Sequence, residues 1–379
     1  MKLKALFKNH YNSDCEVIAR APGRLEILGN HTDYNEGFVL SCAVQQSTYF
    51  AAAKTDSSTC RIYSQEMASE LTFDIDNIGK AIPGEWLNYI KGICLELQKR
   101  GHSLNGFNAV ITSDIPLSSG MGSSAALEVA AAYAIGKMND IELEQLDWAK
   151  LCQACENNYI GANTGLLDQL SSIRAVKDHF VLTDFRNFEQ ENIKLPKDVS
   201  LIIANSGVAH DLTKEYNDRR RRCEDAAKCL SDIYGVTALR DINRQQLEES
   251  KPKLDILSYR RAKHIIEEND RVIKAKAAIE AQDLITFGRL LTESQESSRI
   301  NFENSCQELD ILTGCGKVLS GFYGARLSGG GFGGISIHLV DSSEAEIYRK
   351  RLETAFEIEV GRKPDTMVCK IGQGAEIYV

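Results

Sequence analysis

The sequence feature that most constrains the fold is a loop of small residues, 118–126, between a predicted strand at 106–113 and an apolar predicted helix at 125–138. Gly120 and Gly122 carry no side chain, so the backbone there can approach a ligand closely. Because the loop leads into a helix, unpaired N–H groups and the positive end of the helix dipole face it. The hydroxyls of Ser123 and Ser124 can bond a phosphate or coordinate Mg²⁺. The segment therefore predicts an anion site.

Other interpretations of this loop differ in what must surround it. The spacing Gly120-x-Gly122-x-x-Ala125 also fits a dinucleotide-binding fingerprint, which needs a second strand ending in an acidic residue after the helix. The segment 136–150 instead reads as a turn and another helix. A Walker A loop is excluded because no G-x-x-x-x-G-K-[ST] occurs. A plain serine N-cap with tight glycine packing remains open.

A second glycine run, 328–334, lies between two predicted strands. It contains another G-x-G-x-x-G, but the strand that follows it weakens a dinucleotide interpretation. The run predicts either a loop that closes over a ligand or a tight hairpin.

A polar cluster near the N-terminus includes Arg24, His31, Asp33 and Tyr34. Carboxylates and imidazoles bond pairs of sugar hydroxyls, and an arginine can neutralise a transferring phosphoryl group. A solvated loop with a turn at 35–37 is the alternative.

Two later carboxylates add to this chemistry. Asp168, at the apparent start of a helix, can accept the proton of an attacking hydroxyl, and Glu156 can bind Mg²⁺, although single carboxylates are more often surface charges.

Length and composition predict a two-domain α+β protein that works in the cytoplasm. The chain has 379 residues, and mixed strands and helices without strict alternation place the expected domains at 1–204 and 205–379. The net charge of −9 argues against nucleic-acid binding. No run of about 18 apolar residues occurs, so no membrane span is expected. The eleven cysteines are scattered. The one C-x-x-C, Cys152 and Cys155, has no second pair for zinc, which favours reduced thiols.

Taken together, three segments resemble the GHMP kinase superfamily: 21–40, 116–126 and 327–334. The first, APGRLEILGNHTDYNEGFVL, looks like the signature of the galactokinase family, and the likeness extends from about residue 14 to the end. The resemblance implies an N-terminal domain like ribosomal protein S5, a ferredoxin-like C-terminal domain, and an active site between them. It also implies an enzyme that uses ATP and Mg²⁺ to phosphorylate the anomeric hydroxyl of galactose or a close analogue. The sugar and ATP are the expected partners; the sequence leaves the oligomeric state open, with a monomer slightly favoured.

The resemblance assigns a role to each matching residue. Asp168 would take the proton from the anomeric hydroxyl, and Arg24 would pair with Asp168 and stabilise the transition state. Ser124 and Glu156 would hold Mg²⁺, and Trp86 would lie near the adenine. The phosphates would be bound by Ser118, Ser119, Gly120, Met121, Gly122, Ser123 and Ser124. The sugar would be contacted by Asn30, His31, Asp33, Gly165 and Tyr216.

Two positions depart from the family signature. Asn30 stands where galactokinases carry the glutamate expected to bind the sugar 6-hydroxyl, and Glu26 stands where they carry an asparagine. Glu26 is expected either to pair with Arg24 or to lie on a solvated strand face. Galactose remains the leading substrate, but a sugar altered at C6, such as galacturonate, is an alternative because a glutamate at position 30 would repel its carboxylate. A sugar- and ATP-sensing regulator is an alternative of another class. Because both catalytic residues and the serine-alanine loop are present, we expect an enzyme.

Overall fold

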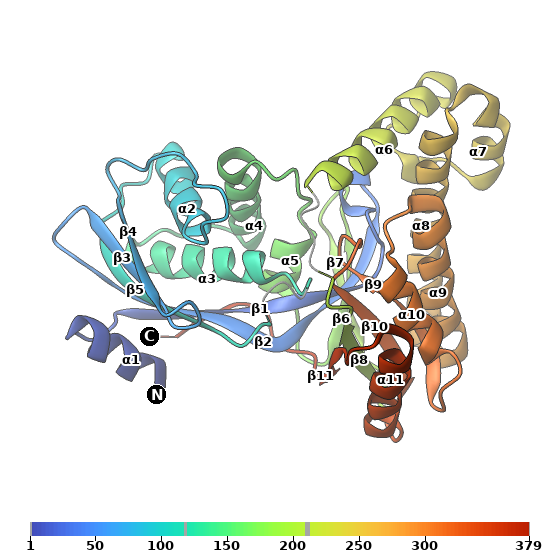
Figure 1. Ribbon diagram of the computed structural model, residues 1–379. Coiled ribbons are helices and arrows are strands. Elements are labelled where there is room, and N and C mark those ends of the chain that lie inside the picture. Colours follow the sequence, from blue (N-terminus) through green and yellow to red (C-terminus); the bar gives the residue numbers. More distant parts are fainter. Residues whose placement is uncertain (1, 117–119, 209–212, 379) are drawn as a thin grey trace.

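The computed structural model describes residues 2–116, 120–208 and 213–378, and it is built around two β-sheets with helices packed against them (Figure 1). The first sheet has eight strands in the order β12-β1-β2-β5-β3-β4, with β6 and β7 attached beside β2. All of its pairs are antiparallel except β3 with β5. Its strands are β1 (Val17–Leu28), β2 (Phe38–Lys54), β3 (Thr59–Ser64), β4 (Ser69–Asp74), β5 (Phe107–Ser113), β6 (His179–Asp184), β7 (Gln190–Lys194) and β12 (Glu376–Tyr378).

Helices cover both faces of this sheet. The upper face in Figure 1 carries α2 (Asn88–Lys99), α3 (Ser123–Met138), α4 (Gln145–Ala154) and α5 (Leu167–Arg174), while α1 (Lys2–Tyr11) lies below. α3 itself carries buried alanines and other apolar residues around most of its circumference, as is typical of a helix buried in a core, and it packs against β1 and β2. The helix after α3 is α4, so the strand that a dinucleotide site requires is absent from 136–150, all of which the structure describes.

The second sheet has four antiparallel strands in the order β11-β8-β10-β9. Numbered along the chain this is 4-1-3-2, and with helices after the first and third strands it is the ferredoxin-like arrangement that the resemblance implied. Its elements are β8 (Val199–Asn205), β9 (Phe322–Ser328), β10 (Ile335–Asp341), β11 (Asp365–Cys369), α10 (Gln307–Gly316) and α11 (Ala345–Val360).

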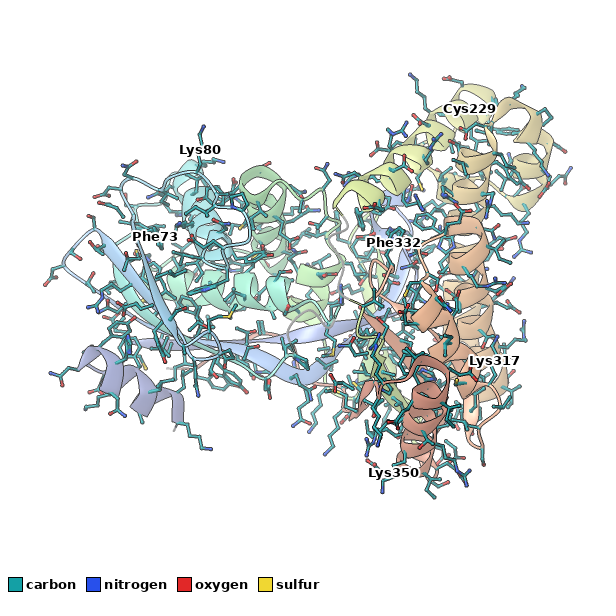
Figure 2. All side chains as sticks on the ribbon, viewed as in Figure 1. Phe73, Lys80, Cys229, Lys317, Phe332 and Lys350 are labelled. Atoms are coloured by element: carbon teal, nitrogen blue, oxygen red, sulfur yellow. The ribbon has the colours of Figure 1, made fainter. Side chains whose placement is uncertain are left out.

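A helical arm is inserted between β8 and β9. It contains α6 (Thr213–Tyr234), α7 (Arg244–Ser250), α8 (Ile256–Glu280) and α9 (Leu284–Ser297), with short turns at Leu239–Asp241, Lys251–Lys253 and Ser298–Phe302. Figure 1 shows α8 and α9 side by side, and α9 packs on β9. Phe332, labelled in Figure 2 near the junction of the two halves, lies under Arg219 of α6, whereas Lys80 and Lys350 project from the outside.

The structure corrects two sequence expectations. From the sequence alone, Pro22 and Gly23 predict a turn at 21–23. This prediction is wrong, because β1 runs through these residues and pairs with β2 from Val17 to Leu28 with two register shifts. Gly23 lies so close to the phosphate loop that an added Cβ would be 2.7 Å from the carbonyl of Met121. The sequence also predicts a helical stretch over 258–291, and the structure divides it, because Gln282, with φ 56°, lies between α8 and α9. The division at 204/205 remains a prediction, although β8 spans it and β12 returns to the first sheet.

Candidate active site

Two of the three sequence motifs, 21–40 and 327–334, line one cavity of about 150 Å³, and the third, 116–126, is joined to it by the hydrogen bond from Arg24 to Gly120. One side is formed by β1 and the loop that follows it, the second by the start of α5, and the third by α6 and the loop between β9 and β10. The second glycine run is therefore a loop over this cavity as well as a hairpin. The described lining residues are Arg24, Glu26, Asn30, His31, Asp33, Thr164, Gly165, Leu167, Asp168, Tyr216, Gly329 and Gly330.

Arg24 joins the expected base to the phosphate loop. Its Nε donates to Asp168 Oδ1 at 2.8 Å and its Nη2 to Asp168 Oδ2 at 2.6 Å, a two-bond fork that fixes the plane of the carboxylate. Its Nη1 donates to the carbonyl of Gly120 at 2.6 Å. Arg24 is buried, while the side chain of Asp168 is 30% exposed and lines the cavity. The geometry places a carboxylate, a guanidinium and the phosphate loop at one point.

Asp33 and Gly165 fit each other closely. A Cβ on Gly165 would lie 1.6 Å from Asp33 Oδ2, so only glycine leaves room for this carboxylate. Burial, reinforced by the nearby charge of Glu26, raises the pKa of Asp33 to about 7. A neutral sugar hydroxyl that donates to Asp33 would favour the ionised form.

The ring of His31 is fixed in one neutral form. Its Nε2 lies 3.2 Å from the carbonyl oxygen of Gly330, which can only accept, so Nε2 carries the proton. Its Nδ1 then accepts from the Tyr34 hydroxyl at 2.8 Å. Burial lowers the pKa of His31 to about 3, and the ring lies 5.0 Å from that of Tyr216. The motif thus provides a rigid aromatic wall.

Glu26 is placed differently from both sequence expectations. It is 3% exposed, so it is not on a solvated face, and it pairs with Arg326 rather than Arg24, with Glu26 Oε1 accepting from Arg326 Nη2 at 3.0 Å. Asn30 Nδ2 donates to the same oxygen at 2.9 Å. Sequence reasoning did not predict Glu26, Thr164 or Leu167 as lining residues. Two sequence signals pointed to Glu26: its departure from the family signature, and its two-residue spacing from Arg24, which places both on one face of a strand.

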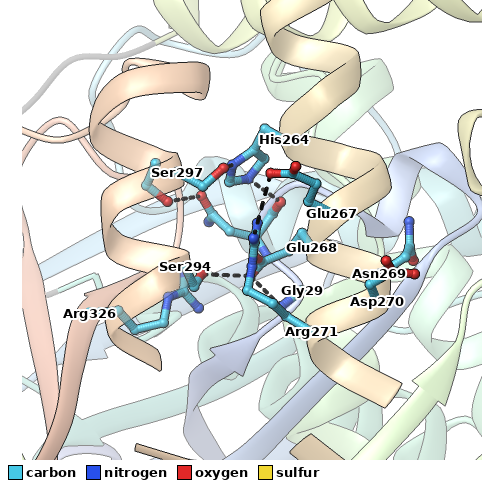
Figure 3. A network of polar contacts seen from close by, with 12 residues as sticks. Gly29, His264, Glu267, Glu268, Asn269, Asp270, Arg271, Ser294, Ser297 and Arg326 are labelled. Carbon is cyan, nitrogen blue, oxygen red and sulfur yellow. Dashed lines mark hydrogen bonds and ion pairs between the residues drawn. The ribbon is translucent and has the colours of Figure 1, made fainter. Parts of the chain in front are cut away.

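A polar network behind the cavity holds the backbone of the loop after β1 (Figure 3). Glu268 of α8 accepts from the amides of Gly29 at 3.0 Å and Asn30 at 3.2 Å. His264 Nε2 donates to the carbonyl of Asn30 at 3.1 Å, because a carbonyl can only accept. The helical arm therefore fixes the position of the loop after β1, which carries Asn30 and His31.

A second cavity, of about 170 Å³, lies beside the start of α3. Trp86, Tyr89 and Leu127 give it apolar walls, and Ser123 and Ser124 reach its edge. Gly122 precedes the helix with φ 68°, a left-handed conformation that suits glycine. Met121 is buried, and Gly120 lies against the second glycine run near Gly334. Ser118 and Ser119, also predicted to bind phosphate, lie outside the described residues.

Buried carboxylates next to Ser124 have the character of a cation site. Glu156, in a π-helical turn at Cys155–Ile160, accepts from Thr164 Oγ1 at 2.5 Å and Gln169 Nε2 at 3.1 Å, and it also bonds Ser124. Gln169 Nε2 lies 3.2 Å from Glu128 Oε2 as well. Burial raises the pKa of both glutamates. Glu128 also bonds the Cys155 thiol, and its Oε1 is among the buried atoms without a hydrogen-bond partner in the described chain. These oxygens fit Mg²⁺.

The described residues can also be compared with the requirements of other metal sites, disulfides and membrane spans. Across 2–116, 120–208 and 213–378, no group of three or more His, Cys, Asp or Glu side chains could hold a metal ion. Mg²⁺ commonly takes only one or two protein carboxylates beside phosphates and water. Cys152 and Cys155 are buried free thiols, and all eleven cysteines, each within the described ranges, are unpaired. No helix in the described chain is long and apolar enough to cross a membrane.

Comparison with known proteins gives one consistent result. Residues 5–54 match the galactokinase galactose-binding signature, 88–175 the GHMP kinase N-terminal domain and 275–358 the GHMP kinase C-terminal domain. The galactokinase of Roseiflexus sp. (strain RS-1) is 37% identical over 98% of this chain and 96% of its own length. The crystal structure of Lactococcus lactis galactokinase complexed with galactose covers 98% of both chains, with 29% identity and a TM-score of 0.94. Methanococcus jannaschii mevalonate kinase, at 18% identity and a TM-score of 0.65 over 94% of this chain and 98% of its own, shares the fold.

Proposed function

The chain belongs to the galactokinase family of GHMP kinases and is an ATP-dependent sugar kinase, and we propose that Asp168 and Arg24 catalyse transfer of the γ-phosphoryl group to the anomeric hydroxyl of galactose. The observation that carries these roles is the two-bond fork of Arg24 on Asp168 at the edge of the cavity. The products of the phosphoryl transfer are galactose 1-phosphate and ADP. We expect the reaction to take place in the cytoplasm, where ATP is available and thiols stay reduced.

The step needs one proton acceptor and one stabiliser of charge. The anomeric oxygen attacks the γ-phosphorus, the bond from that phosphorus to the bridging oxygen of ADP breaks, and the hydroxyl proton passes to Asp168. Arg24 keeps the carboxylate oriented through Nε and Nη2. Its Nη1 lies on the phosphate loop at Gly120, where negative charge shifts towards ADP during transfer. Positioning and electrostatics supply most of the rate enhancement in this chemistry.

Mg²⁺ and ATP bind on the α3 side of the cavity in this proposal. Ser124 and Glu156 would hold the ion, with Glu128 behind them, and bound Mg²⁺ supplies charge neutralisation on the phosphates. Gly120, Met121, Gly122 and Ser123 would bind phosphate oxygens at the helix start. Trp86 would lie against the adenine, because it forms an apolar wall of the neighbouring cavity.

The sugar fills the cavity next to Asp168. Asp33 accepts from its hydroxyls, Gly165 makes room for Asp33, and His31 and Tyr216 form the wall against which the ring lies. The intact Arg24–Asp168 pair is what a working kinase needs, and the family evidence favours catalysis over the sensing alternative.

Asp168→Asn tests the assigned base. The variant should lose turnover by a factor of about 10² or more while still binding ATP, since the cavity at Trp86 is unchanged. Turnover is measured by ADP release with galactose and Mg-ATP, and ATP binding by calorimetry. A control is Asp310→Asn, which removes a carboxylate from α10 away from the sugar cavity and should keep normal turnover. Near-normal turnover in Asp168→Asn would refute the assignment.

A further inference from the structure

We propose that Glu26, rather than Asn30, contacts the sugar: it accepts a hydrogen bond from a hydroxyl remote from the anomeric carbon and makes the cavity selective against sugars that carry a carboxylate. The inference rests on the proposed function and specifies its substrate class. It assigns Asn30 a positioning role, so the two departures from the family signature act together.

Asn30 has no hydrogen-bonding capacity left for a ligand. Its Nδ2 donates to Glu26 Oε1 at 2.9 Å and to the carbonyl of Gly329 at 2.8 Å. Its Oδ1 accepts from Asn304 Nδ2 at 2.9 Å and from Ser298 Oγ at 3.4 Å. An asparagine amide has two donor hydrogens and two acceptor lone pairs, so all four positions are used. The residue is 0% exposed.

The backbone of Asn30 is held as firmly as its side chain. Its amide donates to Glu268 and its carbonyl accepts from His264, the two α8 residues at the centre of Figure 3. Turning the side chain towards a sugar would break bonds to Glu26 and Gly329 inside a buried region, where an unpaired polar group is costly. Asn30 therefore stays where it is when a ligand enters.

Glu26 has one oxygen in use and one available. Oε1 accepts from Asn30 and Arg326, whereas Oε2 accepts no hydrogen bond from the described residues. Oε2 is not among the fully enclosed unpartnered atoms, and Glu26 lines the cavity. The free oxygen thus faces the space that a ligand fills. A carboxylate held by two donors on its other oxygen is a preorganised acceptor for a hydroxyl.

Position along β1 shows which part of the sugar Glu26 meets. Arg24 and Glu26 pair in regular register with Ala43 and Ser41 of β2, so both side chains lie on one face. Two strand residues span about 6.6 Å along the backbone, so the side chain of Glu26 starts that far along β1 from Arg24, which holds the base Asp168. The hydroxyl that donates to Glu26 is therefore on the side of the ring opposite the anomeric carbon.

The charges around the cavity disfavour an anionic sugar. Among the described lining residues, Glu26, Asp33 and Asp168 are acidic, and Arg24 is the one with a permanent positive charge. Arg24 is already paired with Asp168, and Arg326, behind the cavity, is already paired with Glu26. A uronate would add a fourth carboxylate, and none of the described lining residues offers it an unpaired cation. Glu26 thus restores at position 26 the negative charge that position 30 lacks, which removes the reason for expecting a galacturonate kinase.

The test compares sugars and variants under identical Mg-ATP conditions. The value of kcat/KM is measured for galactose, 4-deoxygalactose, 6-deoxygalactose and galacturonate with the full chain, Glu26→Gln and Glu353→Gln. The last variant is a matched control, because Glu353 pairs with Arg349 on α11, away from the cavity. Wild type should use galacturonate and one of the deoxy sugars about tenfold or more less efficiently than galactose.

In Glu26→Gln, kcat/KM for galactose should exceed that for the same deoxy sugar by only about threefold or less. The ratio of kcat/KM for galactose to that for galacturonate should fall by about tenfold or more relative to wild type. Most of the loss on galactose should appear in KM. Glu353→Gln should match wild type throughout. Unchanged deoxy-sugar penalties in Glu26→Gln would overturn the proposal.

Sugar binding, measured by calorimetry in the presence of ADP and Mg²⁺, decides the matter if either of two other results is obtained. If Glu26→Gln does not fold, wild-type binding decides: weaker binding of galacturonate than galactose by about tenfold or more supports the proposal, and a smaller difference overturns it. If wild type phosphorylates none of the sugars, the proposed function fails, while the same binding comparison still tests the role of Glu26.

Discussion

Replacing Glu268 with glutamine should weaken the whole protein and its sugar site together. Glu268 is 0% exposed, and its Oε1 accepts from Gly29, Asn30 and Ser294 while its Oε2 accepts from Arg271 Nε at 2.6 Å. Burial alone raises the pKa of Glu268, but Arg271 and Arg326 reverse this and lower it below the usual range. The folded protein therefore holds a buried carboxylate that several donors stabilise.

The size of the effect follows from what glutamine cannot do. One orientation of the amide turns its NH₂ group towards Arg271, and the other turns it towards the amides of Gly29 and Asn30, so donors face donors in either case. Breaking a buried ion pair in this way costs about 3–5 kcal/mol. For 379 residues that unfold together, the unfolding entropy is about 0.8 kcal/mol/K, which converts this to a fall in Tm of roughly 4–6 °C.

The neighbouring Glu267 provides the control for this prediction. It is on the same helix but lies 3.9 Å from Arg271, too far for a hydrogen bond, so Glu267→Gln should cost about 1 kcal/mol or less. Tm is measured by calorimetry, and KM for galactose should rise in Glu268→Gln alone because the Gly29–Asn30 backbone loses its acceptor. Equal Tm values for the two variants, or a wild-type Tm in Glu268→Gln, would refute the reasoning.

Three further outcomes are expected. Gly165→Ala places a Cβ where Asp33 Oδ2 lies, so it should raise KM for galactose by about tenfold and leave ATP binding unchanged; a normal KM would show that the two groups do not compete for space. Glu156→Gln should raise the Mg²⁺ concentration for half-maximal activity by about tenfold or more, and an unchanged Mg²⁺ requirement would remove Glu156 from the ion site. Burial lowers the pKa of His338 to about 3, so between this value and about 6.5 the unfolded chain takes up a proton that the folded chain refuses, and stability falls as pH drops. Glutamine does not titrate, so the free energy of unfolding of wild type minus that of His338→Gln should fall by about 2 kcal/mol between about pH 7.5 and pH 5. Denaturant titrations that give the same difference at both pH values would contradict the pKa assigned to His338.

Local signals in the sequence were sufficient for the phosphate loop and for most elements. A strand, two glycines and a helix start follow one another within 33 residues, and such short-range patterns carry their own conformational preferences. Arg24, His31 and Asp33 are likewise close in sequence, so the signature indicated the family without any knowledge of packing. Glu128 could also have been predicted beside the Mg²⁺ site from the sequence, since it follows Ser124 by one turn of α3.

Other features depended on contacts that no local pattern encodes. The turn signal at Ala21-Pro22-Gly23 is overridden because β1 pairs with β2 on both sides of Gly23, with a register shift at that residue. Glu26 is the clearest case: alone in the sequence it could have been solvated or paired with Arg24. Arg326, 300 residues later, and Asn30 fix its Oε1 and leave Oε2 facing the sugar cavity. The sequence by itself determined that the chain is a kinase of this family, because the residues that define it are neighbours along the chain. Only the tertiary structure decided which of the two exchanged residues faces the sugar, because burial and hydrogen-bond saturation are set by partners from distant segments.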